Sequence, residues 1–325
     1  MTDDDGLMTI TTQTPAVREA EKRVLAAELS AEKRVTVIVN TRSRKGRKLF
    51  DHACKLFSEA GFTLDATYAV PDPKELDTTV CRAIEAGAQL VAVGGGDGTL
   101  SSVSRHFVGK PVVFGVLPLG TANSFARTLG IPQDLKGAID VLATGRVADI
   151  DLGKVGDRYF TNAAAIGLPA MIGETVPHGL KAVLGRIGYF GWALYSLARF
   201  KPFHCTLIEN GTEKHFEALE VRISNGTHLG GLEVAAEASL ESLDLTIQVV
   251  TGRNGWTLAK SWALSAAGRQ GGEALVSLRT KGLRIVTDPP MSVSIDGEVM
   301  AKTPIEVSVA RQVLKLMVPH EADIH

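Results

Sequence analysis

The sequence of 325 residues contains little cysteine, almost no net charge and no long apolar run. Its three cysteines, Cys54, Cys81 and Cys205, are dispersed without metal-ligand spacing, which is typical of a reducing compartment and excludes a disulfide framework. The 35 lysines and arginines nearly balance the 36 aspartates and glutamates, so no overall field favours nucleic acid as a partner. No uncharged apolar run reaches the roughly 18 residues of a membrane span, so none is expected.

Residues 1–33 are expected to form an N-terminal extension. The opening "MTDDDGLMTITTQTP" is acidic and polar and lacks the basic start and apolar segment of a signal peptide, which favours a cytoplasmic protein. Pro15 and the helix formers after it predict one loosely docked helix.

The first half of the chain alternates short buried runs with amphipathic segments. The predicted strands are "RVTVIVN", "FTLDATYAV", "AQLVAVGG" and "PVVFGVLPLG", and each is followed by a predicted helix. This order indicates a parallel sheet with helices on its faces, and ligands of such sheets bind beyond the carboxyl ends of the strands. After about residue 150, short strands and the turn signals "ENG", "SNG" and "IDGE" predict a mainly antiparallel sandwich or curled sheet.

Four glycines and Asp97 follow the third strand in "VGGGDGT". Bare backbone between a strand and a helix can direct N–H groups at a phosphate. A carboxylate there repels the phosphate unless Mg²⁺ lies between them, so the loop predicts a nucleoside triphosphate with a metal ion. It matches neither the dinucleotide fingerprint nor the P-loop. The alternative is a tight turn with an N-capping aspartate.

A second glycine loop, "PLGTANSFARTLGIP", follows the fourth strand. Thr121 is placed to donate to a phosphate, and Asn123 to cap the next helix or bind a ligand. The alternative is a capped helix with no ligand. Two such loops at neighbouring strand ends favour a binding site more than either loop alone.

These two motifs, at residues 95–99 and 118–132, together resemble the catalytic domain of the diacylglycerol kinase family, in particular its soluble bacterial branch, a relative of sphingosine kinases. NAD kinases share the first motif but not the second. Further matches in the same order are "VNTRSRKG", "DIDLGKVGDRYFTNAAAIG" and "SIDGE". The resemblance extends from Arg34 to near the C-terminus.

The resemblance implies an α/β plus β fold, in which an NAD kinase-like nucleotide-binding α/β domain is followed by a β-sandwich domain. The implied domains are residues 34–155 together with 311–325 for the nucleotide and residues 156–310 for the lipid substrate. The implied cofactors are ATP and Mg²⁺. By motif position, the residues expected to contact ATP are Asn40, Ser43, Thr67, Gly95, Gly96, Gly98, Thr99, Thr121 and Asn123.

Two catalytic residues are expected. Glu298 matches the family's proposed general base, and a carboxylate in an apolar cleft can accept the proton of a lipid hydroxyl. Without the resemblance, Glu298 would be interpreted as an exposed turn residue. Asp97 is the candidate for organising Mg²⁺, and Asp151 is a second candidate ligand.

The sequence departs from the bacterial pattern at three places. In the first loop, Thr41 replaces proline and Arg44 replaces glycine, and the other two departures concern metal binding. Ser124 stands where an aspartate is usual, which removes one charge from the expected metal site. Residues 237–249 contain Glu241 and Ser242 where the family often holds a structural Mg²⁺, so that ion is expected to bind weakly or not at all.

A stripe of apolar residues flanked by lysine, arginine, tryptophan and tyrosine marks a predicted helix over residues 179–200. It is compatible with peripheral contact at the inner membrane face, and equally with a core helix or a homodimer contact.

The function predicted is transfer of the γ-phosphate of ATP to a lipid hydroxyl, with diacylglycerol or a similar glycerolipid as the default acceptor. Two alternatives remain open. Ser124 motivates a nucleotide-binding regulatory protein with weakened catalysis. An NAD kinase-like enzyme with a soluble acceptor would need an Asn-Glu pair downstream, and no convincing pair is present.

Overall fold

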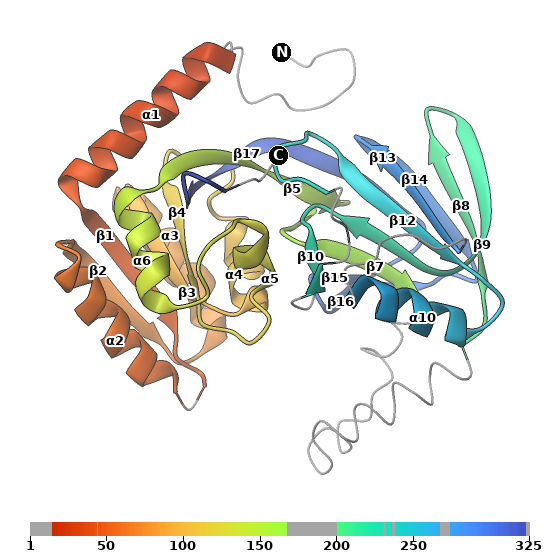
Figure 1. The fold of residues 1–325 in the computed structure, drawn as a ribbon, viewed down its shortest axis with the longest axis horizontal. Helices are drawn as coiled ribbons and strands as arrows, with labels where there is room; N and C mark the ends of the chain where they lie inside the picture. The colour runs from red at the N-terminus through yellow and green to blue at the C-terminus, as the bar shows by residue number, and fades with distance from the viewer. Residues whose placement is uncertain are drawn as a thin grey trace. The chain divides into compact units, whose positions relative to one another are not determined.

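The chain divides into two compact units in the computed structural model. Unit 1 comprises residues up to Leu152 together with Ala310–His325, and unit 2 comprises Gly153–Val309. Figure 1 shows the described helices and strands of each unit, with labels where there is room. The residues whose structure is described are 15–43, 45–167, 200–229, 232–233, 235, 238–266 and 274–322.

Unit 1 is built on a parallel sheet with the strand order β4-β3-β1-β2. Its strands are β1 (Arg34–Asn40), β2 (Thr63–Val70), β3 (Leu90–Gly95) and β4 (Val113–Pro118). In register, Val39 of β1 lies beside Gly94 of β3, and Gly94 lies beside Leu117 of β4. The carboxyl ends of β1, β3 and β4 therefore meet at one edge of the sheet.

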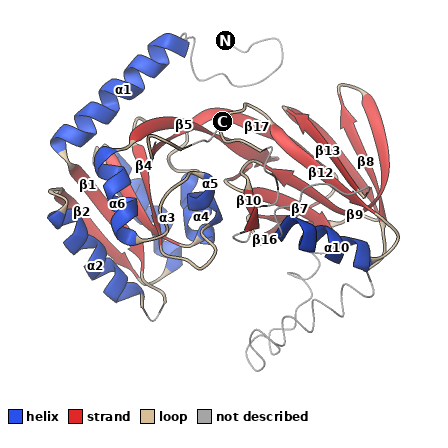
Figure 2. Ribbon diagram, in the orientation of Figure 1, coloured by secondary structure: helices blue, strands red, loops and turns tan. Residues whose placement is uncertain are grey.

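Helices cover both faces of this sheet, as the blue ribbons of Figure 2 show. One group, α2 and α6, packs together and against β1, β2 and β4, whereas α3 and α4 pack together and against β3. The helices of unit 1 are α1 (Pro15–Glu32), α2 (Gly46–Glu59), α3 (Leu76–Glu85), α4 (Asp97–Ser104), α5 (Ser124–Thr128) and α6 (Leu135–Thr144), with the short 3₁₀ helix η1 (Pro73–Glu75) before α3. The apolar spacing of α2 buries Phe50, Ala53 and Phe57, which is why this segment is a docked helix.

Unit 2 is mainly antiparallel. Its central strands run in the order β16-β15-β7-β9-β8-β14, and β12 pairs with both β9 and β13. The strands are β6 (Arg158–Phe160), β7 (Ala163–Gly167), β8 (Phe203–Glu209), β9 (Thr212–Ser224), β10 (His228–Leu229), β11 (Leu232–Glu233), β12 (Leu245–Thr251), β13 (Leu275–Thr280), β14 (Gly282–Asp288), β15 (Ser292–Ile295) and β16 (Glu298–Lys302). The helix α10 (Gly255–Ala266) packs against β9 and β12.

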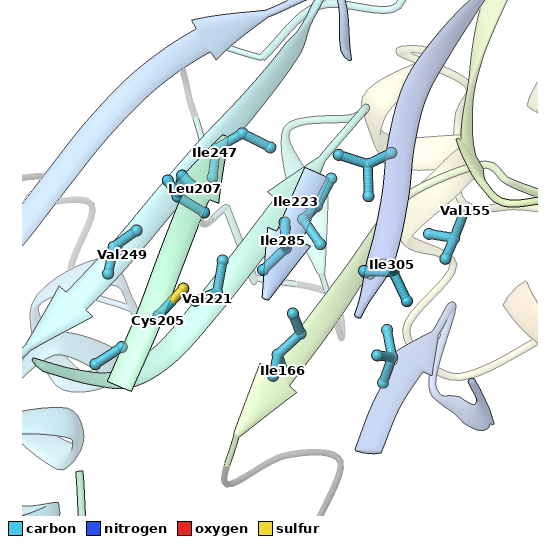
Figure 3. Packing of buried hydrophobic residues seen from close by; sticks show 14 of the residues in the cluster. Val155, Ile166, Cys205, Leu207, Val221, Ile223, Ile247, Val249, Ile285 and Ile305 are labelled. Atoms are coloured by element: carbon cyan, nitrogen blue, oxygen red, sulfur yellow. The ribbon is translucent and has the colours of Figure 1, made fainter. Parts of the chain in front are cut away.

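One face of the unit 2 sheet is a continuous apolar core. Figure 3 shows members of this cluster contributed by β5, β7, β8, β9, β12, β14 and β17. Val221 and Ile223 of β9 alternate with polar residues, so the pleat directs the apolar side chains to one face. The alternation of apolar and polar residues is the reason these segments are strands.

The opposite face contains a buried ion pair. Arg222 Nη2 donates to Glu220 Oε2 over 2.7 Å, and these side chains are 2% and 0% exposed. The indole Nε1 of Trp262 on α10 donates to the same Glu220 oxygen over 2.9 Å, and the Arg222 guanidinium lies 5.6 Å from the Trp262 ring centre. A charged pair thus fixes α10 to the sheet.

Two strands contribute residues to both units. The strand β5 (Arg146–Val155) pairs with β6 and β17, and β17 (Ile305–Val318) pairs with β14 through its first residues and with β4 through Leu316. In unit 1, the backbone N–H of Gln312 donates to Asp151 Oδ1 over 2.7 Å. The predicted fold, a parallel α/β domain followed by a β-sandwich domain, is confirmed.

Candidate active site

The first glycine loop joins β3 to α4. Gly96 precedes the helix with extended backbone (φ −90°, ψ −178°), and its carbonyl accepts hydrogen bonds from Thr99 N (2.9 Å) and Leu100 N (3.1 Å). Asp97 and Gly98 are the first two residues of α4, so their N–H groups precede the first hydrogen-bonded turn. A Cβ added at Gly98 would meet nothing within 4 Å, so this part of the loop is open.

The second loop, between β4 and α5, packs backbone to backbone on the first. A Cβ added at Gly120 would lie 2.5 Å from Gly96 Cα, so only glycine permits this approach. Asn123 occupies the left-handed region (φ 48°), and its Oδ1 accepts from Gly120 N over 2.8 Å. The two motifs predicted to act together are therefore in contact.

The carboxylate of Asp97 links the loops. Its Oδ1 accepts a hydrogen bond from Phe125 N, the second residue of α5, over 3.1 Å. The side chain is partly exposed. Ser124, the residue before Phe125, is 2% exposed, so the position at which the resemblance led us to expect an aspartate is a buried one.

The strand β1 brings a third group to the same edge. Asn40, its last residue, donates from Nδ2 to Thr99 Oγ1 over 2.9 Å, and its Oδ1 accepts from Arg42 N over 3.1 Å. In the following turn the carbonyl of Ser43 accepts from Gly46 N over 2.9 Å. Asn40 thus orients the threonine that ends the first motif.

The remaining predicted nucleotide ligands differ in position. Thr121 is exposed within the second loop. Thr67 pairs with Val37 of β1, three residues before Asn40, and lines a hollow of about 440 Å³ together with Arg47 and Tyr68. The structure therefore brings Asn40, Thr99 and the two glycine loops together by direct contacts, whereas Thr67 lies further back along its strand.

Asp151 and Glu298 have opposite environments. Asp151 is fully buried in β5, where it accepts the bond from Gln312 N. Glu298 belongs to unit 2, where it is the exposed first residue of β16, opposite Ile295. The turn before it is formed by Asp296 (φ 45°) and Gly297 (φ 92°).

Sequence reasoning missed the role of Asp296. Its carboxylate accepts hydrogen bonds from the backbone N–H groups of Thr161 (2.8 Å), Asn162 (3.0 Å) and Ala163 (3.1 Å) and from the Thr161 hydroxyl (3.1 Å). This fixes the turn that holds Glu298 to the segment before β7. The segments "TNAAAIG" and "SIDGE" are both visible as motifs in the sequence. No local pattern indicates that the two segments contact each other.

In residues 237–249, where a metal ion is expected to bind weakly or not at all, Asp244 is paired with Arg279 of β13. Arg279 donates to Asp244 Oδ1 from Nε (3.2 Å) and Nη2 (2.8 Å), and Ser242 Oγ donates to the same oxygen over 2.7 Å. Among the described residues, no group of three or more His, Cys, Asp or Glu side chains is arranged to hold a metal ion. The helix predicted over residues 179–200 lies almost entirely outside those residues.

No helix in the described ranges is long and apolar enough to cross a membrane.

Comparison with known proteins defines the class first. Residues 34–155 match the family profile of the diacylglycerol kinase catalytic domain, and residues 162–318 match that of the YegS C-terminal NAD kinase beta sandwich-like domain. The class is that of two-domain lipid kinases.

The similar proteins and solved structures are named as diacylglycerol kinases. A diacylglycerol kinase of Staphylococcus aureus (strain JH9) is 30% identical over 279 residues, covering 84% of this chain and 88% of that protein. One of Staphylococcus saprophyticus is 28% identical over 296 residues, covering 89% and 96%. The crystal structure of a diacylglycerol kinase from Bacillus anthracis shares the fold, with a TM-score of 0.69, 19% identity and coverage of 88% and 97%.

The chain belongs to the diacylglycerol kinase family and is a lipid kinase. The predicted family and enzyme class are confirmed, and neither alternative function gains support from these relatives.

Proposed function

We propose that this protein transfers the γ-phosphate of ATP to the hydroxyl of diacylglycerol or a similar glycerolipid, with Mg²⁺ as cofactor. The observation that supports this most is the contact between the two glycine loops at neighbouring strand ends, with Asp97 bonded to Phe125. The S. aureus and S. saprophyticus relatives, both named diacylglycerol kinase, point to the acceptor.

The phosphates bind at the loop that follows β3. The first N–H groups of α4 and the positive end of its dipole attract an anion, and Gly98 leaves the approach open. Thr99, oriented by Asn40, and Thr121 add hydroxyl donors. The remaining ATP contacts we propose are those of Asn40, Ser43, Thr67, Gly95, Gly96 and Asn123.

Asp97 is the residue that fits a magnesium ion. Its Oδ1 is engaged by Phe125 N, and its partly exposed carboxylate offers Oδ2 as a hard oxygen ligand. Bound Mg²⁺ would neutralise phosphate charge as transfer proceeds. Asp151 is a weaker candidate because its fully buried carboxylate holds the backbone at Gln312.

Glu298 is proposed as the general base that accepts the proton of the lipid hydroxyl. Its side chain is exposed, so a substrate can reach it. Its backbone is held by the Asp296 hydrogen bonds, and a base must be placed within about 3 Å of the proton that it accepts.

Peripheral contact with a membrane is also proposed, because the acceptor lipid resides there. On α10, Trp256 is 62% and Trp262 is 43% exposed, and tryptophan is typical of membrane interfaces. Replacing Trp256 with serine is expected to weaken co-sedimentation with lipid vesicles. Unchanged co-sedimentation would remove α10 from the proposed contact.

The function is tested with radiolabelled ATP and a panel of lipids in mixed micelles. We expect labelled phosphate on a glycerolipid, and none when Mg²⁺ is removed. ATP binding without transfer to any lipid would instead favour a regulatory protein. Transfer to NAD but to no lipid would favour the NAD kinase-like alternative.

A further inference from the structure

Three side chains of unit 1 form a chain of contacts that the kinase function does not use. Asp77 and Cys81 lie one turn apart on α3, and His106 follows the end of α4. The Sγ atom of Cys81 is 3.4 Å from His106 Nδ1, and His106 Nε2 is 3.0 Å from Asp77 Oδ1. A thiol, an imidazole and a carboxylate are thus connected in the order of a nucleophile, a base and the group that orients the base.

The hydrogen-bond partners assign the protons. A carboxylate only accepts, so His106 donates from Nε2 to Asp77 and presents the Nδ1 lone pair to the Cys81 thiol. Arg105 Nε–H also faces His106 Nε2, over 3.4 Å, but the 3.0 Å contact with the carboxylate is the shorter one and sets the tautomer. Arg105 pairs with the second oxygen of Asp77. The thiol proton can therefore move to Nδ1, and the resulting thiolate lies beside an imidazolium that Asp77 stabilises.

The other two cysteines have the opposite surroundings. Burial raises the pKa of the Cys54 thiol, and the nearby Asp51 carboxylate raises it further. Burial raises the pKa of Cys205 to about 12. Cys54 and Cys81 are both partly exposed, so exposure alone does not distinguish them. What distinguishes Cys81 in the described structure is its contact with a base, the imidazole of His106.

We propose that Cys81, with His106 and Asp77, is a reactive-thiol site that forms mixed disulfides with small-molecule disulfides. His106 Nδ1 accepts the Cys81 proton, and the thiolate attacks one sulfur of the incoming disulfide. A bond forms between that sulfur and Sγ, the original S–S bond breaks, and the departing thiolate takes the proton from His106. The small disulfide is the oxidant, and one equivalent of thiol is released.

The modification also reaches the nucleotide loop, an effect that rests on the proposed function. The helix α4 has eight residues, begins at Asp97 and ends just before Arg105 and His106. An added group on Cys81 displaces His106 from its contact, and α3 packs directly against α4. Since the other end of this short helix carries the phosphate loop, we expect Cys81 modification to weaken ATP binding.

The thiol is tested on the full-length protein with 2-hydroxyethyl disulfide and, in parallel, iodoacetamide at neutral pH, followed by peptide mass mapping. Cys81 is expected to react about tenfold or more faster than Cys54, while Cys205 stays unmodified. In His106→Gln and in Asp77→Asn, the Cys81 rate is expected to fall toward that of Cys54.

Equal rates for Cys81 and Cys54, or a Cys81 rate that both variants leave unchanged, would overturn the proposal. Cys205 is the internal control for folding, because labelling there shows that a variant has opened. If Cys205 is modified in His106→Gln, that variant has opened and Asp77→Asn is used instead. The Asp77 side chain is 39% exposed, so replacing it disturbs packing less.

ATP affinity is then measured before and after disulfide treatment, with Cys81→Ser as the control. The treated wild type is expected to lose affinity about tenfold, and the treated control to keep it. Failure of the untreated protein to bind ATP contradicts the proposed function and leaves the thiol result standing. If Cys81 is modified and the affinity for ATP is unchanged, the expected effect of this modification on the nucleotide loop is contradicted.

Discussion

Asp97 and Phe125 are joined by one hydrogen bond, from the Phe125 N–H to Asp97 Oδ1 over 3.1 Å. The carboxylate that follows β3 is thereby tied to the helix that follows β4. One oxygen accepts this bond and the other is the oxygen proposed to bind an ion, so the charge and the hydrogen bond of Asp97 can be separated by mutation.

Replacing Asp97 with asparagine removes the charge but retains an oxygen that can accept from Phe125 N. We expect folding to be preserved and phosphoryl transfer to fall by about 10²–10³-fold, because charge stabilisation of the phosphates is lost. Steady-state kinetics with a range of Mg²⁺ concentrations, beside a thermal melt, measure this. Asp97→Ala should lower both activity and melting temperature. Full activity in Asp97→Asn would remove the metal role.

Gly98 and Gly120 are expected to respond differently to alanine. A Cβ at Gly120 meets backbone at 2.5 Å, so Gly120→Ala should destabilise the protein by about 1–3 kcal/mol. Gly98 lies in open space within a helix, where alanine is favoured by about 0.5–1 kcal/mol.

Gly98→Ala should therefore melt no earlier than the wild type. If phosphates approach this backbone, its KM for ATP should nevertheless rise several-fold. Denaturant unfolding and ATP titration on both variants separate stability from binding. An unchanged KM in Gly98→Ala would show that the phosphates bind elsewhere.

Ser124→Asp introduces the carboxylate that the sequence resemblance led us to expect at this position. The position is 2% exposed and adjoins Phe125, the partner of Asp97. A buried carboxylate at position 124 and the partly exposed carboxylate of Asp97 repel each other without a cation. The variant is expected to melt below the wild type without Mg²⁺ and to regain stability when Mg²⁺ is added. Ser124→Asn, which has a similar shape and no charge, should show no such dependence; a Mg²⁺ response in both variants would contradict the prediction.

Glu298→Gln tests the proposed base. The side chain is exposed, so stability should be unchanged, while kcat should fall by about 10²–10⁴-fold because proton acceptance is lost. ATP affinity is expected to stay the same. Glu306→Gln, at another exposed glutamate of unit 2, is the matched control and should keep full activity. Equal kcat values in the two variants would exclude Glu298 as the base.

The elements of unit 1 could be predicted because local signals agree with the fold. Strands β1, β3 and β4 are short runs of apolar residues that become buried, and glycine loops follow two of them. The position of Asp97 at a strand end also follows from the sequence. Its bond to Phe125 does not, because it joins residues 28 positions apart through tertiary packing.

Long-range polar contacts were the least predictable features. Asp296 accepts from backbone groups more than 130 residues earlier in the chain. Glu220 and Arg222 are both buried, and the Trp262 that donates to Glu220 lies 42 positions further along the chain. Cys81 and His106 had no recognisable spacing, since two separate helices bring them together. Sequence periodicity reports which face is apolar, and it carries no information about which polar groups meet.

The path of strand β17 determines which parts of this protein can be exchanged with those of a relative. Its last residues, with the rest of Ala310–His325, return to unit 1, so unit 2 is a single uninterrupted insert between Leu152 and Ala310. Unit 2 can therefore be exchanged between relatives as one cassette at two junctions. Unit 1 has to be exchanged as two pieces, and deleting residues from Ala310 onward removes part of the first unit while leaving the residues of the second intact.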